Sequence, residues 1–223
     1  MSVISQNIKD ILKELPSTVE LVAVSKFKPL EDVMEAYQGG QRVFAESRPQ
    51  ELKLKAESLP SDIEWHFIGH LQTNKIKMVV PYVSLIHSVD SLRLLLELEN
   101  YCRRNNYKCN VLLEAYIATE ETKQGFSKEE LIELVPTLET LECIKVKGLM
   151  AMASFTDDQD QIRGEFSRFN EIFHAMEQLQ SAALKEFTIK SFGMTNDYPI
   201  AVEMGSNMVR IGTKIFGARG VQL

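Results

Sequence analysis

The chain has 223 residues, of which 25 are Lys or Arg and 31 are Asp or Glu, so its formal net charge is 25 − 31 = −6. A hydrophobic fraction of 44% and a charged fraction of 25% are typical of globular proteins and exclude disordered and collagen-like chains. The net acidity argues against binding to nucleic acids or anionic membranes, because phosphate groups are recognised by clustered Lys and Arg.

Two kinds of segment alternate along the chain. Short apolar runs are predicted as strands, and longer segments with apolar residues three and four apart are predicted as helices. In chain order we expect a helix over Ser5–Glu14, a strand over Glu20–Ser25, a helix over Glu31–Tyr37, a strand over Arg42–Glu46, a helix over Gln50–Leu59, a strand over Glu64–Gly69, a short helix over Thr73–Val80, a strand over Val83–Ser88, a helix over Ser91–Arg104, a strand over Asn110–Ile117, a helix over Ser127–Val135, a strand over Ile144–Gly148, a helix over Gln159–Ser181, a strand over Phe187–Ser191, a helix containing Ile200–Met204 and a strand over Met208–Ile211.

Eight apolar runs separated by helices predict an α/β protein, a (β/α)₈ TIM barrel that forms one domain over residues 1–223. An open, doubly wound sheet is the alternative. Barrel active sites lie at the carboxyl ends of the strands, so the polar residues that follow each run are the candidates for function. These are Ser25-Lys26, Glu46-Ser47, Gly69-His70, His87–Asp90, Glu120–Lys123, Met150, Gly193–Thr195 and Gly212-Thr213.

The sequence also indicates a compartment. The N-terminal segment has no basic head followed by an apolar block, and no apolar run reaches the ~18 residues of a membrane span. Three cysteines, Cys102, Cys109 and Cys143, form no CxxC pair, and such a sparse, odd count is typical of free thiols in a reducing compartment. We therefore expect a cytoplasmic protein without a membrane segment.

Lys26 ends the most apolar strand predicted in the first third of the chain. A lysine inside a barrel mouth loses hydration, which favours its neutral amine, and a neutral amine can attack an aldehyde. The position therefore suggests Schiff-base chemistry. A solvated lysine at a strand end is the alternative that position alone leaves open.

Two glycine turns follow the last two predicted strands. Gly212-Thr213 precedes a short helical turn, and Gly193-Met194-Thr195 follows the strand before it. Backbone N–H groups in such loops bind phosphate, and the loops after strands seven and eight are the usual phosphate site of a barrel. A pair of ordinary turns is the alternative. The segments match neither GxxxxGK nor GxGxxG, so a nucleotide site has little support.

Arg210 lies within the last predicted strand. If it points inward, it is a buried cation that needs a partner. The ring nitrogen of a heteroaromatic ligand would serve as that partner. A carboxylate on a neighbouring strand is the alternative.

The histidines give no metal site. His66 and His70 are four residues apart, a spacing that suits a metal on a helix but not on the strand predicted here, and no third ligand is suitably spaced. His87, Ser88 and Asp90 resemble a catalytic triad only in sequence, so we interpret them as a polar turn after strand four.

Seven segments in this order closely resemble the family of pyridoxal phosphate homeostasis proteins. They are AVSKFKP (Ala23–Pro29), WHFIGHLQTNK (Trp65–Lys75), IHSVD (Ile86–Asp90), ETKQGF (Glu121–Phe126), KGLMAMA (Lys147–Ala153), FGMTNDY (Phe192–Tyr198) and GSNMVRIGTKIFGAR (Gly205–Arg219). The resemblance covers essentially the whole chain. It implies the barrel of the alanine racemase N-terminal domain, pyridoxal 5′-phosphate (PLP) fold type III, with PLP as cofactor.

The resemblance also implies site residues. Lys26 matches the lysine that forms a Schiff base with PLP, and Arg210 matches the arginine that faces the pyridine nitrogen. The positions that match phosphate loops or polar pocket residues of the family are Gly212, Thr213, Met194, Thr195, Asn74 and His87. The family usually has Ser where Thr195 stands, and Thr keeps the hydroxyl.

Two segments depart from the family pattern. The usual FGENYVQE reads FAESRPQE over Phe44–Glu51, so that Ala45 replaces Gly and Ser47 replaces an Asn near the cofactor ring. The usual QVN after the fifth strand reads Glu114-Ala115-Tyr116. The resemblance therefore does not carry over the contact to the cofactor ring that the Asn of the family makes where Ser47 stands.

The resemblance implies a protein that buffers PLP or delivers it to apo-enzymes, with little or no catalysis. The acidic composition and the absence of an obvious apolar patch favour a monomer over an oligomer. An arginine at the pyridine nitrogen disfavours its protonation and weakens the ring as an electron sink. Racemases of this fold add an acid–base residue from a C-terminal β domain, for which we expect no room before Leu223. The alternatives are a PLP-dependent racemase or lyase, and a cofactor-free Schiff-base aldolase or sugar-phosphate isomerase.

Overall fold

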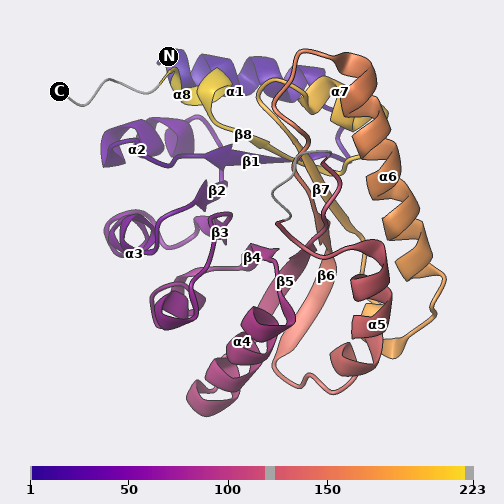
Figure 1. Cartoon of the computed structure of the whole chain (residues 1–223). Helices are drawn as coiled ribbons and strands as arrows, with labels where there is room; N and C mark the ends of the chain where they lie inside the picture. The colour runs from indigo at the N-terminus through magenta and orange to yellow at the C-terminus, as the bar shows by residue number, and fades with distance from the viewer. Residues whose placement is uncertain (1, 119–123, 219–223) are drawn as a thin grey trace.

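The computed structural model describes residues 2–118 and 124–218, so the polar segment Glu120–Lys123 and Arg219 of the last family motif lie outside the described residues. Eight parallel strands form a closed barrel in sequence order, and the last strand closes on the first. The predicted barrel is thereby confirmed, and the open sheet is wrong. The helices lie on the outside of the barrel (Figure 1).

The strands are β1 (Glu20–Val24), β2 (Val43–Glu46), β3 (Glu64–Phe67), β4 (Leu85–Val89), β5 (Cys109–Glu114), β6 (Ile144–Met150), β7 (Ile189–Met194) and β8 (Met208–Ile211). The α-helices are α1 (Val3–Glu14), α2 (Leu30–Gln38), α3 (Pro49–Ser58), α4 (Leu92–Asn105), α5 (Lys128–Leu138), α6 (Gln159–Glu177), α7 (Tyr198–Glu203) and α8 (Thr213–Phe216). Short 3₁₀ helices are η1 (Thr73–Met78), η2 (Val80–Tyr82) and η3 (Ala182–Leu184). Within the described ranges, none of the helices combines the length and the apolar content needed to cross a bilayer.

Two predicted elements differ from the structure. The helix expected over Thr73–Val80 is a pair of 3₁₀ helices, in which the amides of Lys75, Val79 and Tyr82 each donate to the carbonyl three residues earlier. The seventh strand begins and ends later than Phe187–Ser191. Its pairing with β6 begins at Ile189, and its pairing with β8 continues to Met194 through a register shift after Ser191. A residue inserted in this way re-aims the side chains that follow it.

Strand alternation separates two apolar cores. The side chains that point outward from the strands pack against the helices. They form one large cluster with buried helix residues such as Phe166, Phe169 and Phe173 of α6. The side chains that point inward form a smaller apolar cluster composed of Val22, Val24, Ala45, Leu85, Leu112, Met150 and Met208. Because successive residues of a strand face opposite sides, positions two residues beyond these also face the interior.

Toward the carboxyl ends of the strands the barrel interior becomes polar. Buried polar side chains that lie two residues beyond the inward-facing apolar ones include His87, Glu114 and Arg210. His66 of β3 and Ser191 of β7 are buried beside them. The alternation that builds an apolar floor at one end of the barrel therefore places charged and hydrogen-bonding groups at the other.

Gly148 is a point where the barrel has no space for a side chain. It pairs with Ile189, and a Cβ at residue 148 would lie 1.9 Å from the Ile189 carbonyl oxygen. We therefore expect Gly148→Ala to lower the free energy of unfolding by about 3 kcal/mol, measured by urea denaturation. Gly164 in α6 has open space around it, so Gly164→Ala is the matched control and should raise stability by about 0.5–1 kcal/mol. Wild-type stability of Gly148→Ala would contradict this account.

Candidate functional site

A cavity of about 370 Å³ lies at the carboxyl end of the barrel, within the size range of ~300–1,000 Å³ usual for small-molecule sites. Its walls come from the ends of β1, β6, β7 and β8 and from the loops that follow them. The cavity brings together six of the nine residues that the family resemblance places at the cofactor, which are Lys26, Met194, Thr195, Arg210, Gly212 and Thr213. This is the end of a barrel at which active sites lie.

The turn that carries Lys26 is held on both sides. Ahead of it, the Ser25 amide donates to the Ala45 carbonyl at 3.1 Å, and Lys28 N–H closes the turn onto the Ser25 carbonyl at 3.0 Å. Behind it, Phe27 adopts a left-handed backbone with φ of 65°, which is uncommon for a residue that is not glycine. Strained backbone of this kind persists only where the surroundings hold it in place.

A buried ammonium group holds this turn. Lys55 Nζ of α3 donates to the Ser25 carbonyl at 2.7 Å, to Glu46 Oε1 at 2.7 Å and to Glu51 Oε1 at 2.8 Å. Ser25 Oγ also donates to Glu46 Oε1, at 2.6 Å, and the Phe27 amide donates to Glu51 Oε1 at 2.7 Å. One lysine and two carboxylates thus fix the residues on either side of Lys26.

Sequence reasoning missed this network. Burial raises the pKa of Glu46 to about 7, while the ammonium of Lys55 and the Ser25 hydroxyl oppose the rise. The only local sequence signal is the four-residue spacing of Glu51 and Lys55, which places both on one face of a helix. That spacing is more often found in exposed ion pairs, so it does not reveal that Lys55 reaches back by thirty residues to Ser25.

Arg210 is buried in the barrel interior and lines the floor of the cavity. Its Nη1 donates to the carbonyl and the hydroxyl of Ser191 at 2.8 and 2.7 Å, and its Nη2 donates to the Ala151 carbonyl at 2.9 Å. Ser191 Oγ also lies 3.1 Å from His87 Nδ1, and His87 Nε2 lies 3.0 Å from His66 Nδ1. The guanidinium is therefore one end of a buried hydrogen-bonded column.

One direction of donation is consistent with all the side-chain contacts between Arg210, Ser191, His87 and His66. Burial lowers the pKa of His66 to about 4 and holds the pKa of His87 well below its usual value, so each imidazole is neutral and carries one N–H. Because Arg210 can only donate, the Ser191 hydroxyl proton is free to go to His87 Nδ1. His87 Nε2–H then donates to His66 Nδ1. The column thereby fixes the tautomers and holds the guanidinium in one orientation.

Carboxylates lie near Arg210, but among the described residues none of them forms an ion pair with its guanidinium. Burial lowers the pKa of Arg210 to about 10, and the carboxylates of Asp197 and Glu114 oppose this from a distance. Within the described part of the chain, the guanidinium of Arg210 donates to Ser191 and to Ala151. The alternative, a salt bridge to a carboxylate on a neighbouring strand, is therefore wrong for these residues. Arg210 thus presents a positive charge to the cavity.

The two glycine turns meet in the wall of the same cavity. Gly212 N–H lies 3.3 Å from Thr195 Oγ1, and a Cβ at Gly212 would lie 3.1 Å from the Val24 carbonyl oxygen. Asp197 accepts from the Met194 amide at 2.5 Å, which shapes the loop after β7. The turns combine backbone donors and a hydroxyl group, which is the donor set that a phosphate binds.

Three predicted site residues lie outside the described cavity lining. Ser47 is half-buried after β2, and its carbonyl oxygen would lie 2.1 Å from a Cβ at Gly69. Asn74 is exposed in η1. His87 is fully buried within β4 and acts on the cavity only through Ser191 and Arg210, so our interpretation of His87 and Ser88 as a polar turn is wrong.

The histidines have separate partners. His70 Nδ1 lies 3.0 Å from Asp90 Oδ2, whereas His66 faces inward to His87. Among residues 2–118 and 124–218, no three His, Cys, Asp or Glu side chains gather as a metal ion would require.

Sequence reasoning saw Glu114 only as a departure from the family pattern. It ends β5 and faces the barrel interior, 3% exposed. Burial raises its pKa to about 7, with a further rise from Asp90, while Arg210 and His70 act in the opposite direction. A second cavity of about 250 Å³ adjoins it.

The loop after β6 separates the two cavities. Glu165 of α6 holds this loop, because its carboxylate accepts from the Ser154 amide and hydroxyl, both at 2.7 Å. The next residue, Phe155, is 92% exposed. Because the buried Glu165 holds Ser154, the large apolar side chain of Phe155 lies at the mouth of both cavities.

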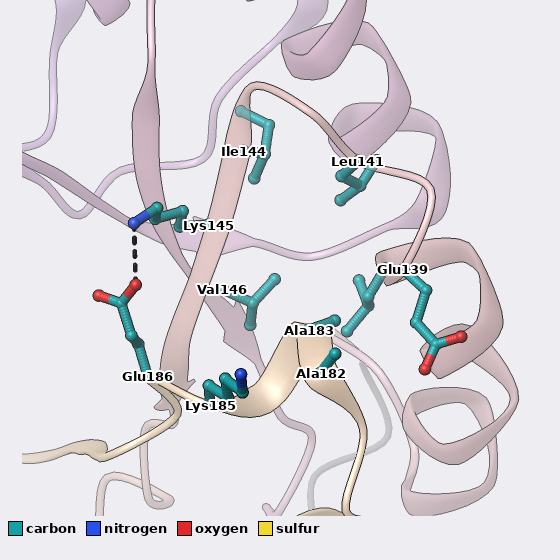
Figure 2. Close-up of a pocket in the computed structure, with 10 residues that line it drawn as sticks. Glu139, Leu141, Ile144, Lys145, Val146, Ala182, Ala183, Lys185 and Glu186 are labelled. Atoms are coloured by element: carbon teal, nitrogen blue, oxygen red, sulfur yellow. Dashed lines mark hydrogen bonds and ion pairs between the residues drawn. The ribbon is translucent and has the colours of Figure 1, made fainter.

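Another cavity, of about 500 Å³, lies at a different end of the barrel. Figure 2 shows it between the start of β6 and η3, with Lys145 paired to Glu186 at 2.8 Å on its rim. Ile144 and Val146 line it at the amino end of β6, whereas Met150 at the carboxyl end lines the first cavity. In barrels the amino-terminal face serves stability rather than catalysis, so we do not assign a function to this cavity.

Comparisons with known proteins agree over nearly the whole chain. The family model for the N-terminal domain of alanine racemase matches residues 1–220. The chain is 39% identical to a pyridoxal phosphate homeostasis protein of Synechocystis sp. over 212 residues, covering 94% of this chain and 96% of that protein. It is 36% identical to the protein of the same name from Haemophilus influenzae over 225 residues, covering 98% and 94%. The structure of PipY from Synechococcus elongatus with PLP bound superposes with a TM-score of 0.86 at 31% identity, covering 96% of this chain and 100% of that one.

Removing the buried ammonium of Lys55 should destabilise the protein. Lys55→Met leaves Glu46 and Glu51 without their shared cation, and breaking a buried pair in this way costs about 3 kcal/mol or more. Urea denaturation at neutral pH measures the loss. The matched control is Lys53→Met, which removes an exposed lysine from the same helix and should cost less than about 1 kcal/mol. Equal effects of the two substitutions would refute the role of the network.

Glu114 should make stability depend on pH. Its folded pKa of about 7 lies above the ordinary 4.5, so the native state binds the proton more tightly and wild-type stability falls as pH rises between these values. Glu114→Gln lacks this titration. Its stability advantage over wild type should grow from near zero at acid pH towards about 3 kcal/mol at about pH 8. Denaturation of both proteins across this range, beside the exposed-site control Glu97→Gln, provides the measurement. A difference that stays constant with pH would contradict the raised pKa.

Proposed function

The chain belongs to the family of pyridoxal phosphate homeostasis proteins, and from this premise we propose that it binds PLP as a Schiff base on Lys26 and serves in PLP homeostasis by holding and delivering the cofactor. The observation that carries the proposal is one cavity lined by a strand-end lysine, a buried arginine and two phosphate-type turns. The PLP bound to PipY supports it, since that protein shares the fold over almost all of this chain.

The residues of the cavity fit the three functional groups of PLP. When bound, PLP supplies an aldehyde that condenses with a lysine amine, and Lys26 is the lysine that lines the cavity. Gly212 N–H and the hydroxyl groups of Thr195 and Thr213 would hold the phosphate. Arg210 on the floor would face the pyridine nitrogen.

Arg210 would also limit catalysis. A guanidinium has only donors, and the column of Ser191, His87 and His66 holds it in place. A ring nitrogen that accepts from Arg210 stays unprotonated, and an unprotonated ring withdraws electrons less strongly. This arrangement favours storing the cofactor over reacting it with amino acids. Delivery would then go to apo-enzymes that use PLP.

The turn that contains Lys26 is held by hydrogen bonds, so the lysine approaches a ligand in the cavity from one fixed direction. Lys55 and Glu51 hold the residues before and after it, so the amine needs little reorganisation to reach a bound aldehyde. Thr195, where the family usually has Ser, keeps a hydroxyl 3.3 Å from Gly212 N–H, so the substitution preserves the donor set of the phosphate turn.

The absorbance spectrum of purified protein with added PLP tests the proposal. We expect a band near ~420 nm that borohydride removes and that Lys26→Ala lacks, because only a Schiff base on that lysine gives both results. Lys26→Ala should fold normally by circular dichroism, since the truncation opens no core. The matched control is Lys28→Ala, whose ammonium is engaged by the carbonyls of Phe216 and Ala218 and whose loss should leave the band intact.

Other outcomes separate the alternatives. Absence of the band in wild type would refute the proposal and favour the cofactor-free aldolase or isomerase. Lys26-dependent conversion of an L-amino acid, followed by chiral chromatography, would favour the PLP-dependent racemase or lyase. Stoichiometric transfer of PLP to an apo-enzyme without such turnover is the result expected for a homeostasis protein.

A further inference from the structure

Glu114 is a buried carboxyl group with an unsatisfied oxygen atom. Its Oε2 has no hydrogen-bond partner within the described part of the chain, although the side chain is only 3% exposed. Polar atoms buried in this way are rare, and leaving one unsatisfied carries a cost in stability. In the closed strand order, β5 lies four strands from β1 in either direction, so Glu114 and Lys26 end strands on opposite sides of the barrel.

The space beside Glu114 is large enough for a small molecule. The cavity of about 250 Å³ is lined by Glu114, Tyr116 and Ile117 on one side and by the loop after β6 on the other. Residues 152–155 and Met194 line both this cavity and the larger one that contains Lys26. A ligand seated here would thus lie against the wall of the proposed cofactor site.

The lining defines the chemistry of that ligand. A carboxylate calls for a donor, and an ammonium group supplies both the donors and the compensating charge. A metal ion does not fit, because no cluster of three ligating side chains occurs among the described residues. Ile117, Met152 and Met194 provide apolar contacts for a short aliphatic body.

We propose that Glu114 and this cavity form a binding site for a small primary ammonium compound, with Glu114 as the group that holds the ammonium. The site deepens the proposed function, on which its biological meaning rests, because amines are the compounds that exchange with an aldehyde held on a lysine. Glu114 stands where the family pattern QVN has the uncharged Gln. Glu114→Gln therefore removes the charge while keeping the shape and the residue type usual in the family.

Calorimetric titration of the cofactor-free protein tests the site. The probes are propylammonium chloride and n-propanol, which have the same apolar body and differ in the charged group, at about pH 8, where Glu114 is mostly ionised. We expect one propylammonium to bind per chain, at least tenfold more tightly than n-propanol. Glu114→Gln should lose at least tenfold in propylammonium affinity, and the exposed-site control Glu97→Gln should bind as wild type does.

Methyl NMR locates the bound probe. Protein labelled at the methionine methyl groups should show shifts of the Met152 and Met194 signals on adding propylammonium, and these shifts should be absent in Glu114→Gln. Equal affinity for the two probes in wild type, retained affinity in folded Glu114→Gln, or unchanged signals from both methionines would each overturn the proposal. If Glu114→Gln does not fold, the comparison of the two probes in wild type decides alone. The titration uses no PLP, so absence of the Lys26 spectral band together with amine binding would refute the proposed function and leave this site standing.

Discussion

The contacts of one buried ammonium group, Lys55 Nζ, underlie the geometry of the candidate site. It joins α3 to the end of β1 and the end of β2 through three oxygen atoms 2.7–2.8 Å away. Burying a lysine is unfavourable unless its charge and its protons are satisfied, and here two carboxylates and a carbonyl satisfy them. The left-handed residue Phe27 sits next to this arrangement, and its amide is bound by the same Glu51 carboxylate. The position of Lys26 is therefore set by residues that do not line the described cavity.

Inside the barrel, Arg210 is a second buried cation that is held in place by hydrogen bonds. The interior is apolar further from the carboxyl ends of the strands and becomes hydrogen-bonded near them. There Arg210, Ser191, His87 and His66 are joined in this order by hydrogen bonds. Two neutral imidazoles allow the column to remain buried without further charges. A guanidinium held in this way is ordered before any ligand arrives, so binding does not have to order it.

The amino-acid sequence predicted the part of the fold that depends on local pattern. Buried parallel strands form continuous apolar runs, which is why eight strands could be counted. Lys26 and Gly212 could then be placed just after strands, and Arg210 within the last strand. Strand β7 was misplaced because the partners that set its limits, Gly148 on β6 and Arg210 on β8, are distant in the sequence. Lys55 and Ser191 were missed because their partners lie 30 and 19 residues away, at distances where spacing carries no information. Family resemblance supplied the roles of individual residues, and it carried no account of Glu114, whose environment is known only from the closed barrel.

The seam between β1 and β8 joins the two ends of the chain. Lys26 follows the first strand, whereas Arg210 and Gly212 belong to the last, and four residue pairs from Glu20↔Met208 to Ala23↔Ile211 hold these strands together. During synthesis, the lysine leaves the ribosome long before its companions in the cavity exist. A nascent chain therefore cannot assemble this pocket, and the proposed reaction of Lys26 with PLP is confined to molecules whose barrel has closed. Ligand bound across the seam would in turn resist its opening, so occupancy and completion of the fold are thermodynamically linked.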